Sequence, residues 1–163
     1  MAEPRELTNI RRLVAVLRIT LGIILLVQWY DNLQKGIYTA DGIAGLFDWI
    51  FNETGGGPAF YRAIIEGTIL QAPGLFANFQ LVAELLLGLG LLFGALTTLA
   101  GLGALLFFLN LLFAYLGGQE WIWTYVLLSS SAFVVAFTHS GRAFGIDQFL
   151  VRRWGEPRWP ILW

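Results

Sequence analysis

The sequence predicts an all-α integral membrane protein, a bundle of four membrane-spanning helices with both termini in the cytoplasm. The first observation is composition. The 163 residues are 57% hydrophobic and 13% charged, with a mean hydropathy of +0.68, whereas soluble domains carry roughly 25% charged residues. The second is four apolar runs, each close to the about 20 residues that cross a bilayer. The third is a concentration of arginine on one side of these runs.

The charge, cysteine and histidine content excludes several classes of protein. A net charge of -1 and a pI of about 5.7 provide no basic surface for a nucleic acid. The chain has no cysteine, one histidine (His139) and one methionine (Met1). Disulfides, thiolate metal sites and haem held by paired ligands are therefore not expected, and neither is any other metal. A redox role would use a bound organic cofactor such as a quinone, or a partner subunit.

Four spans are expected within a single membrane domain, residues 1–163. The spans cover approximately residues 13–30, 75–96, 99–116 and 121–138. Arg11 and Arg12 precede the first span, but it is longer than the apolar core of a signal peptide and has no small-residue cleavage site. We therefore expect it to be retained. Only Thr97 and Thr98 separate the second span from the third, which predicts a tight antiparallel pair.

The connection at 31–74 is too long for a simple loop between bundle helices, which usually takes about 2–8 residues. Apolar residues recur in it with helical spacing: Ile43, Leu46, Phe47, Ile50 and Phe51. We expect an amphipathic helix capped by Asp41, a break at 55–57, and a second helix that Pro58 starts and that covers Ala59 to about Leu70. These helices are interpreted as lying in the membrane interface, or alternatively as a lid or a docking face for a soluble partner.

The C-terminal tail at 139–163 is expected to hold a short interfacial helix bound to anionic lipid headgroups. Asp147 is its expected N-cap. His139, where the last span ends, is expected to have a capping or interfacial role rather than a proton-handling one.

Basic residues set the predicted orientation, because they concentrate on the cytoplasmic side of membrane proteins. Seven arginines flank one side of the bundle: Arg5, Arg11, Arg12, Arg142, Arg152, Arg153 and Arg158. The opposite connections carry only Lys35 and Arg62 among several acidic residues. Tryptophans agree with both interfaces: Trp29, Trp121 and Trp123 outside, and Trp154, Trp159 and Trp163 inside. The protein is thus predicted to be a multi-pass plasma-membrane protein.

A few polar residues lie within the apolar spans, where such groups are costly and are functional candidates. They are Arg18, Gln28, Glu84, Asn110 and Ser129 to Ser131. Depth along the helices predicts a polar layer of Glu84, Gln28, Asn110 and the serines, with Arg18 lower. Glu84 has two interpretations. It pairs with Arg18 or bonds to Asn110 and holds helices together, or it exchanges protons with a quinone.

Three short motifs resemble the DoxX/DoxD family. They are Arg18-x-x-Leu21-Gly22 followed by Lys35-Gly36, the glycine series after Glu84 (Gly88, Gly90, Gly94), and the run Gly141-Arg142-Ala143-Phe144-Gly145-Ile146-Asp147. The resemblance covers almost the whole chain and implies a four-helix membrane protein. Some relatives are the small membrane subunit of thiosulfate:quinone oxidoreductase. The long outer connection fits that branch.

The resulting expectation is a membrane subunit of a quinone-linked oxidoreductase of the DoxX/DoxD type. Glu84 is the candidate catalytic residue, and Arg18, Gln28 and Asn110 are the candidate quinone-binding residues. Membrane lipids and other protein subunits are the expected partners. The alternatives are a non-catalytic assembly subunit of a larger membrane complex and, more weakly, a small-solute transporter.

Overall fold

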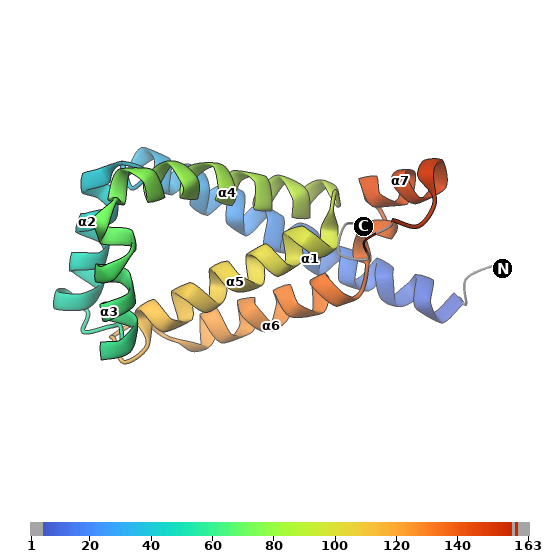
Figure 1. Cartoon of the computed structure of the whole chain (residues 1–163). Helices are drawn as coiled ribbons and strands as arrows, with labels where there is room; N and C mark the ends of the chain where they lie inside the picture. Colours follow the sequence, from blue (N-terminus) through green and yellow to red (C-terminus); the bar gives the residue numbers. More distant parts are fainter. Residues whose placement is uncertain (1–4, 158, 160–163) are drawn as a thin grey trace.

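A computed structural model describes residues 5–157 and 159 of the chain, and the described part contains seven α-helices and no strand (Figure 1). The helices are α1 (Arg5–Gln34), α2 (Ala40–Asp48), α3 (Ala59–Gly67), α4 (Pro73–Phe93), α5 (Thr97–Tyr115), α6 (Trp123–Phe137) and α7 (Ile146–Trp154). The predicted all-α class is confirmed. Arg158 and Trp163, which the sequence places at the inner interface, lie outside the described residues.

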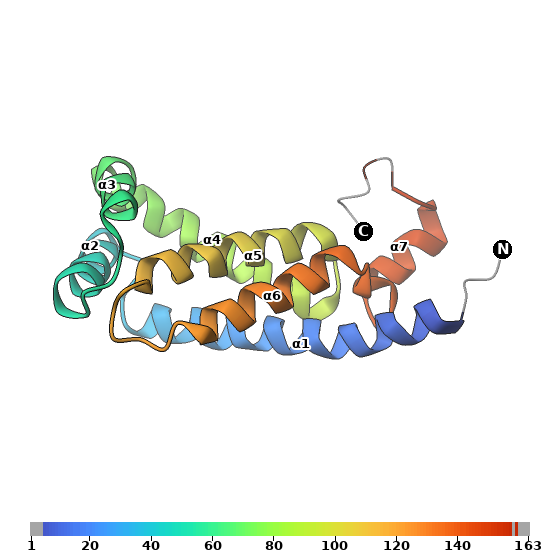
Figure 2. The same cartoon turned by 90° about the horizontal axis from the view of Figure 1, so that it is seen from below.

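The four longest helices, α1, α4, α5 and α6, lie side by side, with α1 against α4 and α6, and α5 against the same two neighbours (Figures 1 and 2). Their shared core contains Leu21, Leu25, Leu91, Phe108 and Val135, each with almost no exposed surface. Small residues permit the close contacts. A Cβ on Gly22 of α1 would lie 2.5 Å from the Leu92 backbone nitrogen of α4, so only glycine fits there.

Two helices, α4 and α5, are long and apolar enough to cross a membrane by length and composition, and α6 is a shorter apolar helix. Two left-handed residues, Gly94 (φ 64°) and Leu96 (φ 49°), make the turn between α4 and α5. Helix α4 thus ends at Phe93, three residues before the expected end of the second span at residue 96. Thr97 and Thr98, expected to form the turn, instead begin α5.

The 31–74 connection folds into α2, a short π-helix at Trp49–Glu53, α3 and a 3-10 turn at Ile69–Gln71. These segments lie across one end of the long helices (Figure 1) and have their own core, which includes Ile43, Phe47 and Ile65. The expected capping by Asp41 is wrong. Thr39 caps α2, because its hydroxyl accepts the Gly42 N–H at 3.0 Å, and Asp41 lies inside the first turn.

The tail helix α7 begins where α6 ends, at the same end of the molecule as the start of α1 (Figure 2). The expected N-cap role of Asp147 in this helix is wrong, because Gly145 occupies the N-cap position. The buried Asp147 carboxylate instead accepts the backbone N–H groups of Leu96 and Thr97, at 2.7 and 2.9 Å. It therefore caps the first turn of α5, a helix 50 residues earlier in the chain.

Candidate functional site

Arg18 and Glu84 do not pair, so the interpretation in which Glu84 pairs with Arg18 is wrong. Arg18 is 0% exposed, and its two terminal nitrogens donate to the backbone oxygens of Ser140 and Phe144, both at 3.0 Å. It packs against Gly94 at the far end of α4. Gly94 follows Glu84 by ten residues, which is about 15 Å along a helix. Antiparallel packing of α1 on α4 sets this register.

We call the group around the guanidinium the Arg18–Asp147 cluster. It consists of Arg18, Thr97, Ser140, Asp147 and the backbone of Gly94, Gly141, Phe144 and Gly145. The Asp147 carboxylate is near enough to attract the guanidinium. Side chains at the three glycines would collide with Arg18, Thr97 or Asp147. The cluster thus joins α1, the α4–α5 turn and the start of α7, and has backbone rather than open space around it.

Glu84 lies in the other half of the bundle and is 1% exposed. Its Oε2 accepts a hydrogen bond from the Tyr38 hydroxyl at 2.8 Å. Asn32 and Gln80 also face this carboxyl. Its Oε1 has no hydrogen-bond partner among the described residues. Because an unpaired buried oxygen is costly, it marks a place where a ligand or water would gain by binding.

An apolar crevice between α4 and α5, about 450 Å³ in volume, leads to Glu84. We call it the α4/α5 crevice. Its walls are Ile69, Phe76, Phe79, Gln80, Ala83, Glu84, Leu86, Leu87, Gly103, Leu106, Phe107 and Asn110. Three of these residues carry polar side chains: Gln80, Glu84 and Asn110. A second apolar hollow of about 380 Å³ shares Leu86 and Leu87 with the crevice and extends toward Leu96.

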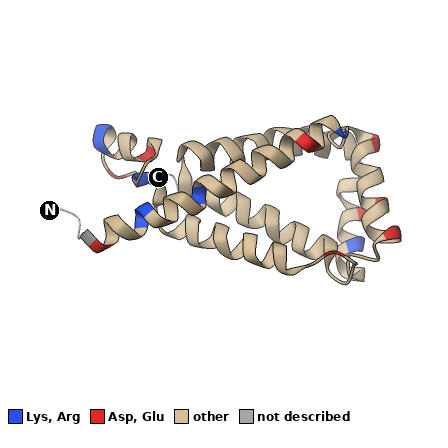
Figure 3. Ribbon diagram, turned by 180° about the vertical axis from the view of Figure 1, so that it is seen from behind, with Lys and Arg blue, Asp and Glu red and all other residues tan. Residues whose placement is uncertain are grey.

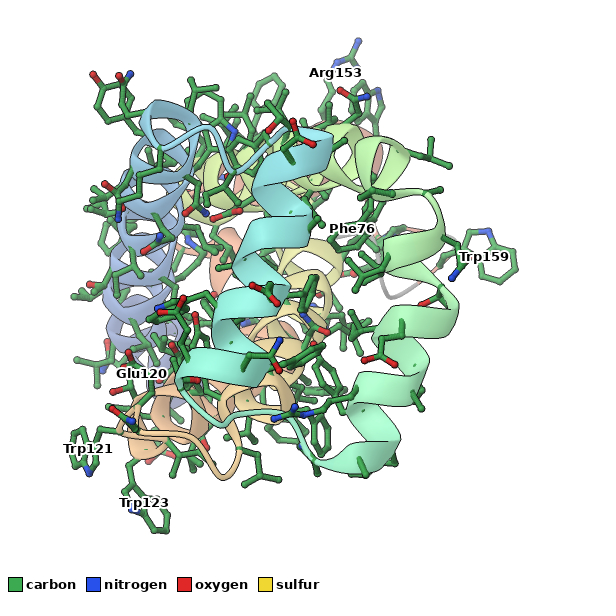
Figure 4. The ribbon with its side chains drawn as sticks, turned by 90° about the vertical axis from the view of Figure 1, so that its left-hand side faces the viewer. Phe76, Glu120, Trp121, Trp123, Arg153 and Trp159 are labelled. Atoms are coloured by element: carbon green, nitrogen blue, oxygen red, sulfur yellow. The ribbon has the colours of Figure 1, made fainter. Side chains whose placement is uncertain are left out.

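The 31–74 connection lies at one end of the crevice, where Ile69 of the 3-10 turn contributes to its wall. Figure 4, which looks onto this end, shows Phe76 between the two short helices and Trp121 and Trp123 at the edge, pointing away. The Tyr61 hydroxyl of α3 donates to Asn110 Oδ1 of α5 at 2.9 Å. Asn110 therefore bonds to Tyr61 and not to Glu84 as one interpretation expected. Burial raises the pKa of Tyr61, so this hydroxyl stays a donor at physiological pH.

A third space, a cavity of about 340 Å³ between α1, α5 and α6, also has Gln80 in its wall. We call it the polar cavity, because Gln28, Asn32, Gln80, Tyr115, Thr124 and Tyr125 contribute to its wall. Gln28 is exposed and donates to Asn32 Oδ1 at 2.9 Å. Gln28 thus lines the polar cavity and is absent from the wall of the crevice, whereas Gln80 lines both.

Tyr38 lies in the 31–74 connection and joins it to the site through the hydrogen bond to Glu84. Burial, and then the hydrogen bond to Glu84, raise the pKa of Tyr38 well above its ordinary value, so its hydroxyl remains protonated. Tyr38, Tyr61 and Gln80 were not among the residues predicted from the sequence. Tyr38 and Tyr61 lie outside the apolar spans, so depth within a span gave no signal for them. Gln80 lies one helical turn before Glu84, and this spacing could have found it.

The remaining polar candidates lie apart from Glu84. Ser129 is buried, and its hydroxyl has no partner in the described part of the chain, whereas the Ser130 hydroxyl donates to the Val126 carbonyl of its own helix. His139 adopts a left-handed conformation just after α6, and its Nδ1 lies 3.3 Å from the Thr98 hydroxyl. Among the described residues, no group of three or more His, Cys, Asp or Glu side chains is arranged to hold a metal ion.

Comparison of the chain with family models, curated proteins and solved structures finds no match.

Proposed function

We propose that this chain is an integral membrane protein with four spans, and that it serves as the membrane subunit of a quinone-linked oxidoreductase resembling the DoxX/DoxD type. The observation that carries the proposal is Glu84, a buried carboxyl that lines a largely apolar crevice and has one oxygen without a partner among the described residues. A quinone has a polar head with two carbonyl oxygens and a long apolar tail. The crevice offers both environments within one space.

Four spans are proposed because α1 and α5 pack against α4, and α6 packs against α1 and α5. In α1, Arg18 is the only charged residue between Leu13 and Tyr30, and α6 is apolar although short. Arginine and lysine lie mainly at the end where α1 begins, and acidic residues mainly at the α2/α3 end (Figure 3). This distribution supports cytoplasmic termini in the plasma membrane.

The side chains of the crevice suit a quinone head. The Asn110 and Gln80 amides are potential donors to its carbonyl oxygens, and Glu84 is a group that can accept or give a proton. Leu86, Leu87 and Leu106 suit the tail. A bound quinone supplies two-electron, two-proton redox chemistry. The Tyr38 hydroxyl orients the Glu84 carboxyl and leaves Oε1 turned to other partners.

Neither Arg18 nor Gln28 is retained in this proposal as a quinone ligand. Arg18 is engaged in the Arg18–Asp147 cluster, and Gln28 lines the polar cavity. With no cysteine and one histidine in the sequence, we propose that a partner subunit delivers the electrons. Thiosulfate is the electron donor we would test first, because the family resemblance points to it.

The test is extraction of quinone from protein purified in native lipid. Wild type is expected to retain quinone, and Glu84→Gln to lose most of it together with thiosulfate-dependent quinone reduction in the native complex. Glu66→Gln, an exposed glutamate on α3, is the matched control and should match wild type. Absence of quinone in wild type, with full activity in Glu84→Gln, would refute the proposal.

The second candidate function is a non-catalytic assembly subunit. The outer face of α3 favours it, since Phe60 and Ile64 are 56% and 55% exposed there. Affinity purification from native membranes separates the two functions. A stoichiometric partner that survives Glu84→Gln but is lost from a Phe60→Ser/Ile64→Ser variant supports assembly.

A further inference from the structure

Gln80 and Phe107 line both the α4/α5 crevice and the polar cavity, whereas Glu84 itself lines the crevice only. The crevice wall is apolar except for three side chains, whereas six of the residues lining the polar cavity carry a hydroxyl or an amide. We propose that the polar cavity is a water-filled proton path, which connects Glu84 with the aqueous phase at the α2/α3 end of the molecule. The path would carry protons for the proposed quinone chemistry. Only this use of the path rests on the proposed function.

The inner end of the path lies at two amide side chains beside Glu84. Asn32 lines the polar cavity and faces both the Glu84 carboxyl and the Tyr38 hydroxyl. Gln80 lines the polar cavity and faces the same carboxyl. Glu84 Oε1 has no other partner among the described residues. A water molecule held by these amides would be within reach of the carboxyl, and would complete its hydrogen bonding.

The volume and polarity of the cavity both suit water. Its volume of about 340 Å³ is many times the roughly 10–15 Å³ that one water molecule requires. Cavities lined by leucine and phenylalanine alone stay dry, but water enters those that offer two to four polar partners. Gln28, Asn32, Thr124 and the stacked rings of Tyr115 and Tyr125, 5.1 Å apart, provide such partners.

The outer end of the path reaches exposed residues. Gln28 and Thr124 line the cavity and are themselves exposed. Thr124 lies in the first turn of α6, beside Trp123, which is 61% exposed at the edge of the α2/α3 end (Figure 4). Exposed tryptophan is typical of the headgroup level of a bilayer. The mouth of the cavity is therefore near water, whereas the crevice opens between two apolar helices.

In the proposed step, the Glu84 carboxyl releases its proton to a cavity water, or takes one from it, and the proton moves along the water to the mouth. Only an O–H bond is broken and another formed, so no oxidant or reductant takes part. Asn32 and Gln80 are positioning residues, because they order the water and carry no proton themselves. Tyr38, the titratable group that touches Glu84, stays protonated throughout.

The first test is hydrogen–deuterium exchange of the Glu84 carboxyl, followed by infrared spectroscopy at acidic pH, where the carboxyl is protonated. Glu84→Gln identifies the band by its loss. In wild type, the band is expected to shift promptly in D2O. Asn32→Leu and Gln80→Leu are expected to slow the shift roughly tenfold or more. Asn110→Leu, which removes an amide on the crevice side, is the control and should leave the rate unchanged.

Equal exchange rates in wild type, Asn32→Leu and Gln80→Leu would overturn the proposal, as would slowing by Asn110→Leu alone.

The second test does not depend on these variants, and it uses the natural absence of cysteine. Leu25→Cys places a thiol in the wall of the polar cavity, and Leu87→Cys places one in the wall of the crevice. In lipid nanodiscs, a charged thiol reagent is expected to label Leu25→Cys and not Leu87→Cys.

Burial alone would predict the opposite labelling, because Leu25 is 1% exposed whereas Leu87 is only partly buried. Labelling of Leu25→Cys by an uncharged reagent only would show a dry cavity and overturn the path. Neither experiment contains quinone. A chain that retains no quinone but passes both tests would refute the proposed function and leave the path intact.

Discussion

Arg18 and Glu84 are both ionisable residues with almost no exposed surface, but their surroundings differ. In the Arg18–Asp147 cluster, two backbone oxygens accept from the guanidinium, an aspartate opposes its charge, and glycine backbone encloses it. Around Glu84, one oxygen has a partner and the other has none among the described residues, and the α4/α5 crevice adjoins the carboxyl. Burial alone therefore does not distinguish a structural charge from a candidate functional one. An unpaired atom does not distinguish them either, since Arg18 Nε also has no partner among the described residues. The adjacent space does, because Glu84 lines a crevice and backbone encloses Arg18.

The largest expected effect contrasts the two acidic residues. Asp147→Asn removes the charge that opposes Arg18 and places a donor where two N–H groups need acceptors. We expect a loss of about 3–5 kcal/mol in unfolding free energy. Glu84→Gln keeps an acceptor for the Tyr38 hydroxyl and should cost about 1 kcal/mol or less. Unfolding of both variants in detergent, followed by circular dichroism, measures the difference. Equal losses would contradict the comparison.

A smaller effect is expected from filling the space beside Arg18. Gly94 has φ 64°, and a Cβ there would collide with Arg18 Nη1. Gly94→Ala should cost about 1–3 kcal/mol, because it adds backbone strain to the collision. Gly45→Ala in α2 is the matched control, since a Cβ there would have no neighbouring atom within 4 Å, and it should be neutral or stabilising by up to about 1 kcal/mol. Similar melting temperatures for the two variants would show that the cluster tolerates movement.

The smallest expected effect is a pH dependence from His139, which lies next to the cluster. Burial, and then the positive charges of Arg142 and Arg11, lower the pKa of His139 in the folded protein. The unfolded chain therefore takes up this proton first as the pH falls. Stability is expected to fall as the pH decreases from the ordinary histidine value to the lowered one, and to be unaffected above that window.

His139→Gln should flatten this part of the dependence of the melting temperature on pH. Glu84→Gln serves as the comparison, because its substitution leaves His139 in place and should retain the slope over the same window. An unchanged slope in His139→Gln would assign the acid sensitivity to another group.

Much of the helical organisation could be predicted from the sequence because it follows from composition and period. The long apolar runs correspond to α1, α4, α5 and α6, and the spacing of Ile43, Phe47 and Ile50 corresponds to α2 and the π-helix that follows it. Helix ends were less predictable. Thr39 rather than Asp41 caps α2, because either residue type is a good cap and only the backbone conformation selects between them.

The candidate site was predicted only in part. Glu84 and Asn110 do line one crevice, since both lie at similar depth on neighbouring helices. Depth placed Arg18 lower than Glu84, and it does lie at the far end of α4, but depth left open a pairing of the two side chains. The packing of Gly22 against Leu92 sets the register of α1 on α4, in which Arg18 lies beside Gly94. Tyr38 was missed because it lies 46 residues from Glu84 and reaches it only through the fold of the connection.

By itself, the sequence determined the helical class, the apolar character of the long helices and the small set of polar residues among them. Periodicity and the cost of placing charge in an apolar environment act locally, so they can be evaluated from a run of residues. The tertiary structure decided which polar residues meet: Arg18 with Ser140 and Phe144, Asp147 with the start of α5, and Tyr38 with Glu84. These contacts join segments far apart in the chain, and only close packing between helices determines them.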